Sequence, residues 1–317
     1  MKNIIRTMLF VLSFVFLGCS LNNEVIPLAP SLVSTANELP PTLADQKVLF
    51  FSVQRNGSYL VASLDQEFRK NIDILGNYFK LSSNGHYLLY TTSLESMEVQ
   101  VHMLDVSTGE DRVLFESKDI PGGVTHLGIS DPSLSPDGNS VVFQANITNE
   151  EFGLGLYSLK NQTIRMITTE GLNSAPEISA TGEKVVFICE GKETIAFQIC
   201  VIDIDGSNRL HLTDVEGYHD AWFSPDSEHI VYEHTLTSFI RKPIIGLYVM
   251  DIEGKNVVRL VDGDTHFLTF STDGKDVVFC KFPEDSEICE GVYVIGIDGK
   301  NLRKLTYFDD EFLSKWR

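Results

Sequence analysis

The sequence lacks the short motifs that identify many enzymes. It contains no GxxxxGK[ST] phosphate-binding loop, no HExxH zinc motif, no GxSxG nucleophile motif and no CxxC pair. The signatures of P-loop nucleotide hydrolases, zincin proteases, α/β-hydrolases and thioredoxin-like redox proteins are therefore missing. Basic residues are also scarce, because 25 Lys and Arg stand against 44 Asp and Glu and give a formal net charge of −19. A field of this sign opposes binding to nucleic acid and anionic lipid, and favours cationic partners or simple solubility.

The N-terminal apolar run is too short to cross a membrane as a helix. "TMLFVLSFVFLG" (7–18) has 12 residues, whereas a membrane-spanning helix needs roughly 20. The run follows Lys2 and Arg6, and this order of a positive start and a short apolar stretch is typical of a signal peptide. The sequence therefore predicts a signal peptide over residues 1–18.

The end of this run resembles a bacterial lipobox. In "FLGCS" a glycine precedes Cys19, although Phe16 and Leu17 depart from the preferred Leu and small residue. The resemblance implies that Cys19 is the lipidated first residue of the mature chain, and the alternative is ordinary secretory cleavage that leaves Cys19 free. Residues 19–44 contain four prolines and little charge, which predicts a flexible tether after the lipid.

The rest of the chain repeats one pattern. Its clearest copies are "LSSNGHYLLY" (81–90), "LSPDGNSVVF" (134–143), "ISATGEKVVF" (178–187), "FSPDSEHIVY" (223–232) and "FSTDGKDVVF" (270–279). Each has an apolar residue, a small polar residue, a turn signal and three apolar residues that end in an aromatic. A second shared block follows each copy and is typical of two strands around a tight turn. A period of roughly 40–50 residues with four short strands is typical of β-propeller blades.

An incomplete copy lies at each end of the predicted domain. Residues 45–75 contain the second, third and fourth strands of a blade but no first strand, and "FLSKW" (312–316) matches a first strand with nothing after it. We therefore expect an all-β fold over residues 45–317: a six-bladed β-propeller of four-stranded blades, with the ring closed by the C-terminal strand completing the first blade. Such closure would remove an unpaired sheet edge.

The repeat resembles that of the TolB-like (WD40-like repeat) β-propellers of bacterial envelopes. The likeness rests on the "SPDG…VVF…LYVMDIEGKNVVRLV" pattern, and two copies depart from it with "SATG" and "SPDS" at the turn. It implies the propeller architecture and an envelope location, in the outer membrane facing the periplasm or the cell surface. The α/β domain that precedes the propeller in TolB has no counterpart between the signal and the repeats, so the role of TolB itself is not implied.

Four cysteines besides Cys19 permit disulfides in an exported chain. The Asn-Gly turn of "RNGS" (55–58) predicts a strand register that, transferred to the blade around residues 178–213, places Cys189 opposite Cys200. These two cysteines are therefore predicted to form a disulfide. A second bridge between Cys280 and Cys289 stays open, because Cys289 lies four residues before the equivalent position.

Polar residues are predicted to gather where the innermost strands begin, at one mouth of the central channel. The candidate binding residues are Asp131, His219, Asp220, His266, Asp310 and Glu311. Their mixture of carboxylates and imidazoles suits a cationic or polar ligand better than an anionic one. A hydrated polar funnel explains two scattered histidines without any metal, and no cofactor or metal is expected.

Three classes of function are compatible with this sequence. The favoured one is a lipid-anchored, monomeric binding or scaffolding propeller whose partner is a protein, peptide or glycan of the envelope. An enzyme, either a lyase or a hydrolase, would carry a metal or a strongly perturbed acid/base pair around His219 and His266. A purely structural member of an envelope assembly is the third. The fold cannot choose among them, because propellers host many unrelated activities.

Overall fold

The computed structural model describes ten stretches of the chain. They are residues 47–54, 58–63, 69–74, 76–83, 85–125, 128–191, 197–213, 218–236, 244–282 and 291–305. The predicted signal peptide (1–18) and tether (19–44), with Cys19, lie outside them. Within the described stretches, no helix is long and apolar enough to cross a membrane.

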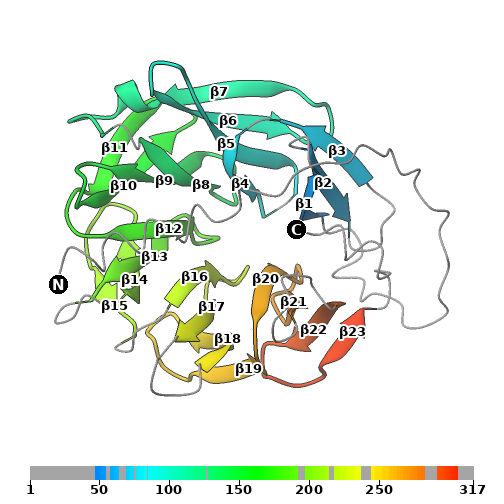
Figure 1. Cartoon of the computed structure of the whole chain (residues 1–317). Helices are drawn as coiled ribbons and strands as arrows, with labels where there is room; N and C mark the ends of the chain where they lie inside the picture. Colours follow the sequence, from blue (N-terminus) through cyan, green and yellow to red (C-terminus); the bar gives the residue numbers. More distant parts are fainter. Residues whose placement is uncertain are drawn as a thin grey trace. The chain divides into compact units, whose positions relative to one another are not determined.

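The described chain forms antiparallel sheets arranged as the blades of a propeller (Figure 1). The first sheet has three strands, β1 (Lys47–Gln54), β2 (Ser58–Ser63) and β3 (Arg69–Asp73). The next blade has β4 (Asn77–Leu81), β5 (Tyr87–Ser93), β6 (Val99–Asp105) and β7 (Asp111–Glu116), and a 3-10 turn, η1 (Ser117–Asp119), follows it.

Four further blades repeat this plan. The second four-stranded blade has β8 (Ile129–Leu134), β9 (Ser140–Asn146), β10 (Phe152–Ser158) and β11 (Thr163–Thr168). The third has β12 (Asn173–Ile178), β13 (Lys184–Glu190), β14 (Phe197–Asp203) and β15 (Leu210–His211). The fourth has β16 (Tyr218–Phe223), β17 (His229–Leu236), β18 (Ile244–Asp251) and β19 (Val258–Asp262). The fifth has β20 (Thr265–Phe270), β21 (Asp276–Lys281), β22 (Gly291–Gly296) and β23 (Arg303–Leu305).

The prediction of six four-stranded blades closed by the C-terminal strand is wrong. The structure has five four-stranded blades and one three-stranded sheet, ordered β1-β2-β3. Each four-stranded blade begins with a strand directly before the repeated turn, whereas in the described chain no strand precedes β1. Strand β1 lies beside β4 and β20, and the proposed closing segment 312–316 lies outside the described residues.

A buried serine explains the small polar residue of the repeat. Its hydroxyl accepts a hydrogen bond from the backbone N–H five residues later, at 2.9–3.0 Å, in every four-stranded blade. These serines are Ser82, Ser135, Ser179, Ser224 and Ser271. In three of the blades the same hydroxyl donates to the Asp two residues later. The serine therefore satisfies backbone and side-chain groups that would otherwise be left unpaired at the turn.

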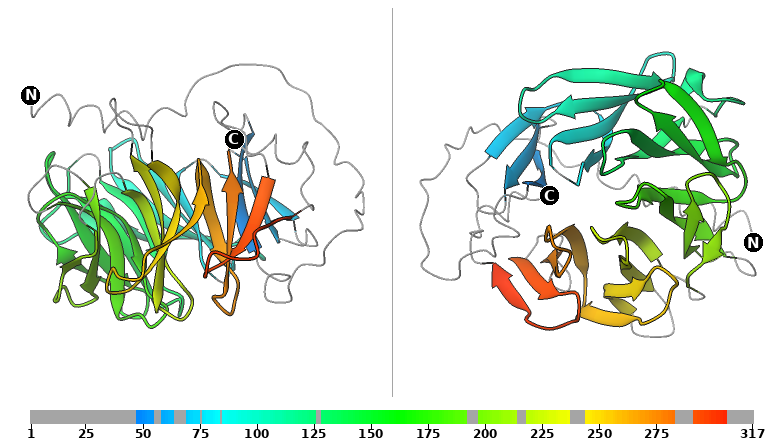
Figure 2. Two further views of the ribbon diagram at one scale, coloured as in Figure 1. Left: turned by 90° about the horizontal axis from the view of Figure 1, so that it is seen from below. Right: turned by 180° about the vertical axis from the view of Figure 1, so that it is seen from behind.

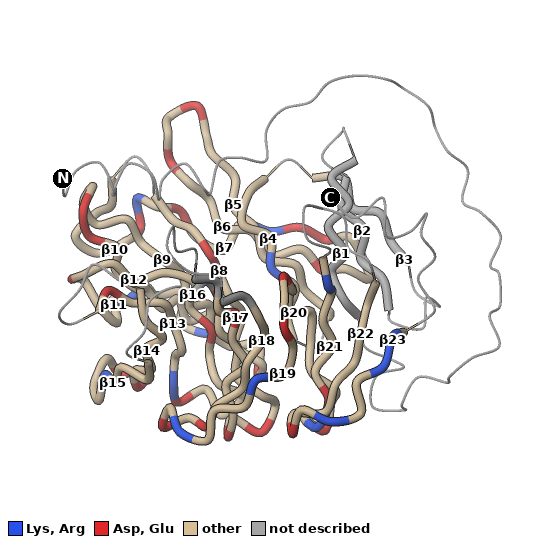
Figure 3. Tube along the Cα trace, turned by 60° about the horizontal axis from the view of Figure 1, so that its bottom comes forward, with Lys and Arg blue, Asp and Glu red and all other residues tan. Residues whose placement is uncertain are grey.

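The aromatic residue that ends each apolar triplet forms the core between blades. These aromatics lie on the second strand and are at most 4% exposed: Tyr90, Phe143, Phe187, Tyr232 and Phe279. Facing sheets contribute to one cluster at each junction, as where Phe115 of β7 contacts the rings of Phe143 and Tyr157 at 4.9 and 4.7 Å between centroids. The core is thus a series of sheet-to-sheet interfaces. Figure 3 shows charged residues concentrated in the turns at one end of the blades.

Replacing Ser271 by Ala is expected to lower the free energy of unfolding by about 1–3 kcal/mol, because the N–H of Asp276 loses its acceptor in a buried turn. Ser207→Ala is the matched control: this hydroxyl also donates to an aspartate, Asp205 at 2.7 Å, but it is exposed. Urea denaturation of both variants tests the prediction. Equal destabilisation by the two substitutions would contradict it.

Candidate functional site

The innermost strands of the five four-stranded blades, β4, β8, β12, β16 and β20, face the centre of the ring (Figure 2). Three of the six predicted site residues are described there: Asp131 on β8, Asp220 on β16 and His266 on β20. The side chain of His219, and residues Asp310 and Glu311, lie outside the described part of the structure. The sequence therefore assigned the described three to the strands that border the centre.

A register shift interrupts the pairing of all five innermost strands, and in three of them the shifted stretch contains a residue with a positive φ. The pairing register shifts within β4, β8 and β12, and one residue in each bulge has a positive φ: Tyr78 (52°), Asp131 (48°) and Ala175 (48°). A bulge adds an unpaired residue and re-aims the neighbouring side chains. The Asp131 carboxylate accepts a hydrogen bond from the backbone N–H of Ala175, so consecutive bulges are joined across neighbouring blades.

Six ionisable side chains interact around the centre of the ring. We name them the central charged cluster: Lys80, Asp131, Glu177, Asp220, Glu233 and His266. Lys80 forms an ion pair with Glu177, which also accepts a hydrogen bond from Ser133 Oγ at 2.9 Å. On the other side, His266 Nδ1 lies 3.4 Å from Glu233 Oε1. Every four-stranded blade contributes at least one member.

Burial and neighbouring charges displace the pKa values of two aspartates in this cluster. Burial raises the pKa of Asp220 to about 7, and Glu233 adds to the rise while Lys80 and His266 oppose it. Burial also raises the pKa of Asp131, against the attraction of Lys80. Two acids that retain protons more tightly than usual therefore share the centre of the ring.

The pKa values of the two basic members are raised, whereas burial alone would lower them. Burial would lower the pKa of His266, but Glu233 and Asp220 together raise it. Burial would likewise lower the pKa of Lys80, and Glu177, Asp220 and Asp131 raise it. Both remain accessible, with 30% of the Lys80 side chain and 45% of the His266 side chain exposed. A ligand can therefore reach the cluster although protein surrounds it.

Three members of the cluster were not predicted from the sequence: Lys80, Glu177 and Glu233. Strand pairing shows the missed signal for two of them, because Lys80, Ser133 and Glu177 occupy equivalent positions opposite Leu89, Val142 and Val186. A repeat alignment that compared this position would have found Lys, Ser and Glu directly before the apolar residue that opens each copy.

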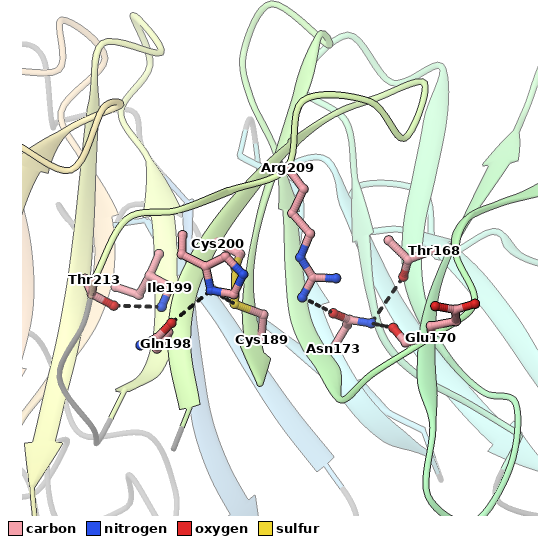
Figure 4. The surroundings of a disulfide bond; sticks show 10 residues. Thr168, Glu170, Asn173, Cys189, Gln198, Ile199, Cys200, Arg209 and Thr213 are labelled. Atoms are coloured by element: carbon pink, nitrogen blue, oxygen red, sulfur yellow. Dashed lines mark hydrogen bonds between the residues drawn. A yellow bond between two sulfur atoms is a disulfide. The ribbon is translucent and has the colours of Figure 1, made fainter. Parts of the chain in front are cut away.

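The predicted cysteine pair lies in the β12–β15 blade. Cys189 and Cys200 are joined by a disulfide, with a Cα–Cα distance of 5.9 Å (Figure 4). The register from which the pair was predicted is wrong: β1 pairs Phe50 with Leu60, and Cys189 faces Gln198 while Cys200 faces Phe187. The cysteines are diagonal neighbours on one face, which still brings the sulfurs together.

The second predicted bridge is described at one end only. Cys280 of β21 is disulfide-bonded, and Cys289 lies outside the described residues. Among the described residues, one set of metal-type ligands has converging donor atoms, and it consists of Cys189, Cys200 and His211. This set belongs to the blade and not to the central charged cluster.

Comparisons with known proteins identify the fold. No protein-family model matches the sequence, and no curated protein sequence matches it. TolB from Acinetobacter baumannii is similar in structure, with a TM-score of 0.61 and 19% identity over 82% of this chain and 63% of that chain. A putative TolB from Agrobacterium tumefaciens has a TM-score of 0.57 and 18% identity over 81% and 87% of the two chains.

An enzyme of known structure is also similar. Oligogalacturonate lyase from Vibrio parahaemolyticus has a TM-score of 0.53 and 15% identity, covering 78% of this chain and 70% of that chain. At such low identity these similarities establish the fold alone, and this chain spans less than two thirds of the Acinetobacter protein. The chain is an all-β propeller structurally similar to the propeller domain of TolB.

Asp220→Asn is expected to raise the melting temperature at pH 8 and to leave it nearly unchanged at pH 4. A carboxyl whose pKa rises from 3.8 to about 7 on folding binds its proton more tightly in the folded state, so stability falls as the pH rises between these values. Asparagine cannot lose a proton and so removes this loss of stability. Each kcal/mol regained raises the melting temperature by about 2–4 °C in a domain of this size.

Calorimetry at the two pH values measures the effect. Asp298→Asn is the control, because hydrogen bonds lower the pKa of this exposed turn residue and its replacement should not stabilise the protein at pH 8. A change of equal size at both pH values for Asp220→Asn would contradict the prediction.

Lys80→Met is expected to lower the free energy of unfolding by about 1–3 kcal/mol at pH 7, because the carboxylates of the cluster lose their compensating cation. The expected loss of stability is smaller than for a fully buried ion pair, because 30% of the Lys80 side chain is accessible to solvent. Lys255→Met removes an ion pair to Glu253 that is 69% and 67% exposed, so its cost should stay below about 1 kcal/mol. Equal free energies of unfolding for the two variants, measured by urea denaturation, would contradict the prediction.

Proposed function

We propose that this chain is a lipid-anchored β-propeller of the bacterial envelope that binds a protein, peptide or glycan partner through the central charged cluster. The observation that carries the proposal is the convergence of six ionisable side chains from all five four-stranded blades on the centre of the ring. Recessed but accessible polar groups that converge from several elements are typical of ligand sites.

The charge of the cluster favours a partner group that is cationic or polar. Four of its members are carboxylic acids, opposed by one lysine and one histidine, and the whole chain carries a net charge of −19. Tyr78, at the bulge of β4, is 43% exposed and lies within the electrostatic range of Asp131. An aromatic ring beside carboxylates suits an organic cation such as an ammonium or guanidinium group.

The lipid anchor rests on the N-terminal sequence. A positive start, a short apolar run and Cys19 after "FLG" support export and lipidation. Membrane fractionation of the wild type and of Cys19→Ser tests this part separately: the variant should move to the soluble fraction of the envelope. A variant that stays in the membrane fraction would remove the anchor from the proposal.

An enzyme is the second candidate, because Asp220 has a pKa of about 7 next to a histidine with a raised pKa. A proton donor or acceptor is most effective when its pKa lies near the working pH. The structural similarity to a lyase makes this candidate worth testing but carries no activity to this chain. Turnover that disappears in Asp220→Asn while partner binding persists would favour it.

Loss of partner capture from solubilised envelopes is the expected result for the double variant Asp131→Asn and Asp220→Asn. The matched control is Glu253→Gln with Asp298→Asn, which also removes two acidic groups but from exposed turns. Quantitative cross-linking should recover the same partner with wild type and control and much less with the central variant. Equal recovery by all three folded proteins would overturn the proposed site.

A further inference from the structure

We propose that Cys189, Cys200 and His211 form a metal site for a thiophilic divalent ion such as Zn²⁺ when their disulfide is reduced. This site is independent of the central charged cluster and of the function proposed for it. Its basis is the placement of three metal-type ligands on adjacent strands of one blade.

Strand pairing brings the three side chains to the same face. Cys200 of β14 pairs directly with His211 of β15, and Cys189 of β13 lies diagonal to Cys200. Their donor atoms all lie within 4.8 Å of one another, and His211 Nδ1 lies 3.7 Å from Cys189 Sγ. Ligands of a tetrahedral ion with metal–sulfur and metal–nitrogen bonds of about 2.3 and 2.0–2.1 Å lie at comparable separations from one another.

A fourth ligand is available beside these three. Gln198 lies two residues before Cys200 on the same face of β14, and its Oε1 is 2.8 Å from His211 Nδ1 (Figure 4). In the disulfide form the imidazole donates its Nδ1 proton to this oxygen. In the metal form the proton would reside on Nε2, and the amide oxygen or a water molecule would complete a four-coordinate site.

The ligand types select a zinc-like ion over magnesium or calcium. Thiolate and imidazole are soft or intermediate ligands that favour zinc, whereas magnesium and calcium favour carboxylate and carbonyl oxygens. Both cysteines are fully buried, while His211 is partly exposed. The histidine side therefore provides the approach for the ion, and the apolar surroundings protect the thiols.

Reduction is the step that opens the site. A dithiol reductant transfers two electrons and two protons to the Cys189–Cys200 bond, the sulfur–sulfur bond breaks, two thiols form and the reductant becomes a disulfide. Binding of the divalent ion then displaces both thiol protons, because thiolates are the ligands. In the oxidised form both sulfur atoms are bonded to each other, so the ion has no thiolate to bind.

The metal would also secure the edge of the blade. Strand β15 consists of Leu210–His211 alone and pairs with β14 at two positions. Coordination through His211 would attach this short edge strand to the two strands beneath it. We therefore expect Zn²⁺ to restore thermal stability that reduction removes, and to have no such effect on the oxidised protein.

The test is a Zn²⁺ titration of the full chain, oxidised and after phosphine reduction, in competition with a chromophoric chelator. The reduced protein should bind one ion tightly and the oxidised protein should not, and Co²⁺ should give the absorption spectrum of tetrahedral thiolate coordination. His211→Ala should keep the disulfide in the oxidised protein but weaken Zn²⁺ binding by about tenfold or more in the reduced one.

Two variants control for the other thiols and histidines that reduction or zinc can reach. Cys280→Ser and His86→Ala should bind Zn²⁺ like the wild type, because neither residue belongs to the site and His86 is an exposed histidine outside the central charged cluster. The double variant Cys189→Ser with Cys200→Ser should not bind Zn²⁺ at this site. If that variant fails to fold, His211→Gln tests the site by removing the histidine ligand alone. Zinc binding that is absent from the reduced wild type, or unchanged in both His211 variants, overturns the proposal.

Discussion

At the first turn of every four-stranded blade, a serine hydroxyl accepts the backbone N–H of the residue five positions later. The bond closes the turn between the innermost strand and its neighbour and thereby sets where pairing of the two strands starts. Side chains alternate between the faces of a strand, so this register decides which residues enter the core. Phe143 and its equivalents reach the interface between blades for this reason. Ring packing thus follows from a local polar contact.

The register between the innermost strand and its neighbour also decides which polar side chains face the centre of the ring. The bulges of β4, β8 and β12 interrupt the pairing near the start of the innermost strands, where the neighbouring blades approach one another. Glu177 can then bond Ser133 of one blade and Lys80 of another. Burial raises the pKa values of Asp131 and Asp220, which is the usual effect of placing carboxyl groups where protein replaces water.

The central charged cluster and the cysteine–histidine set differ in how they are built. The cluster needs several blades, because each contributes one or two side chains that alone would be ordinary surface groups. Cys189, Cys200 and His211 need one blade only, since three successive strands carry them on one face. Formation of the ring is therefore essential to the first site, whereas folding of a single sheet is sufficient for the second.

The sequence by itself determined the repeating unit and the strands on which three of the predicted site residues lie. The serine turn and the apolar triplet act between residues at most five positions apart, so the pattern could be found without knowledge of the ring. It placed Asp131, Asp220 and His266 on innermost strands. It did not determine that Glu233 pairs with His266, because that contact depends on how two blades are oriented to each other.

Tertiary structure alone decided the composition of the central cluster, the diagonal relation of the two cysteines and the number of four-stranded blades. The register of β13 and β14 depends on pairing along the whole strand, which a turn in another blade does not specify. The prediction for the first sheet required a strand from the far end of the chain, and long-range pairing of this kind carries an entropic cost that a local pattern does not report. Local hydrogen bonds and side-chain periodicity can be predicted from residues that are close in the sequence. Contacts between blades form only after packing has brought distant residues together.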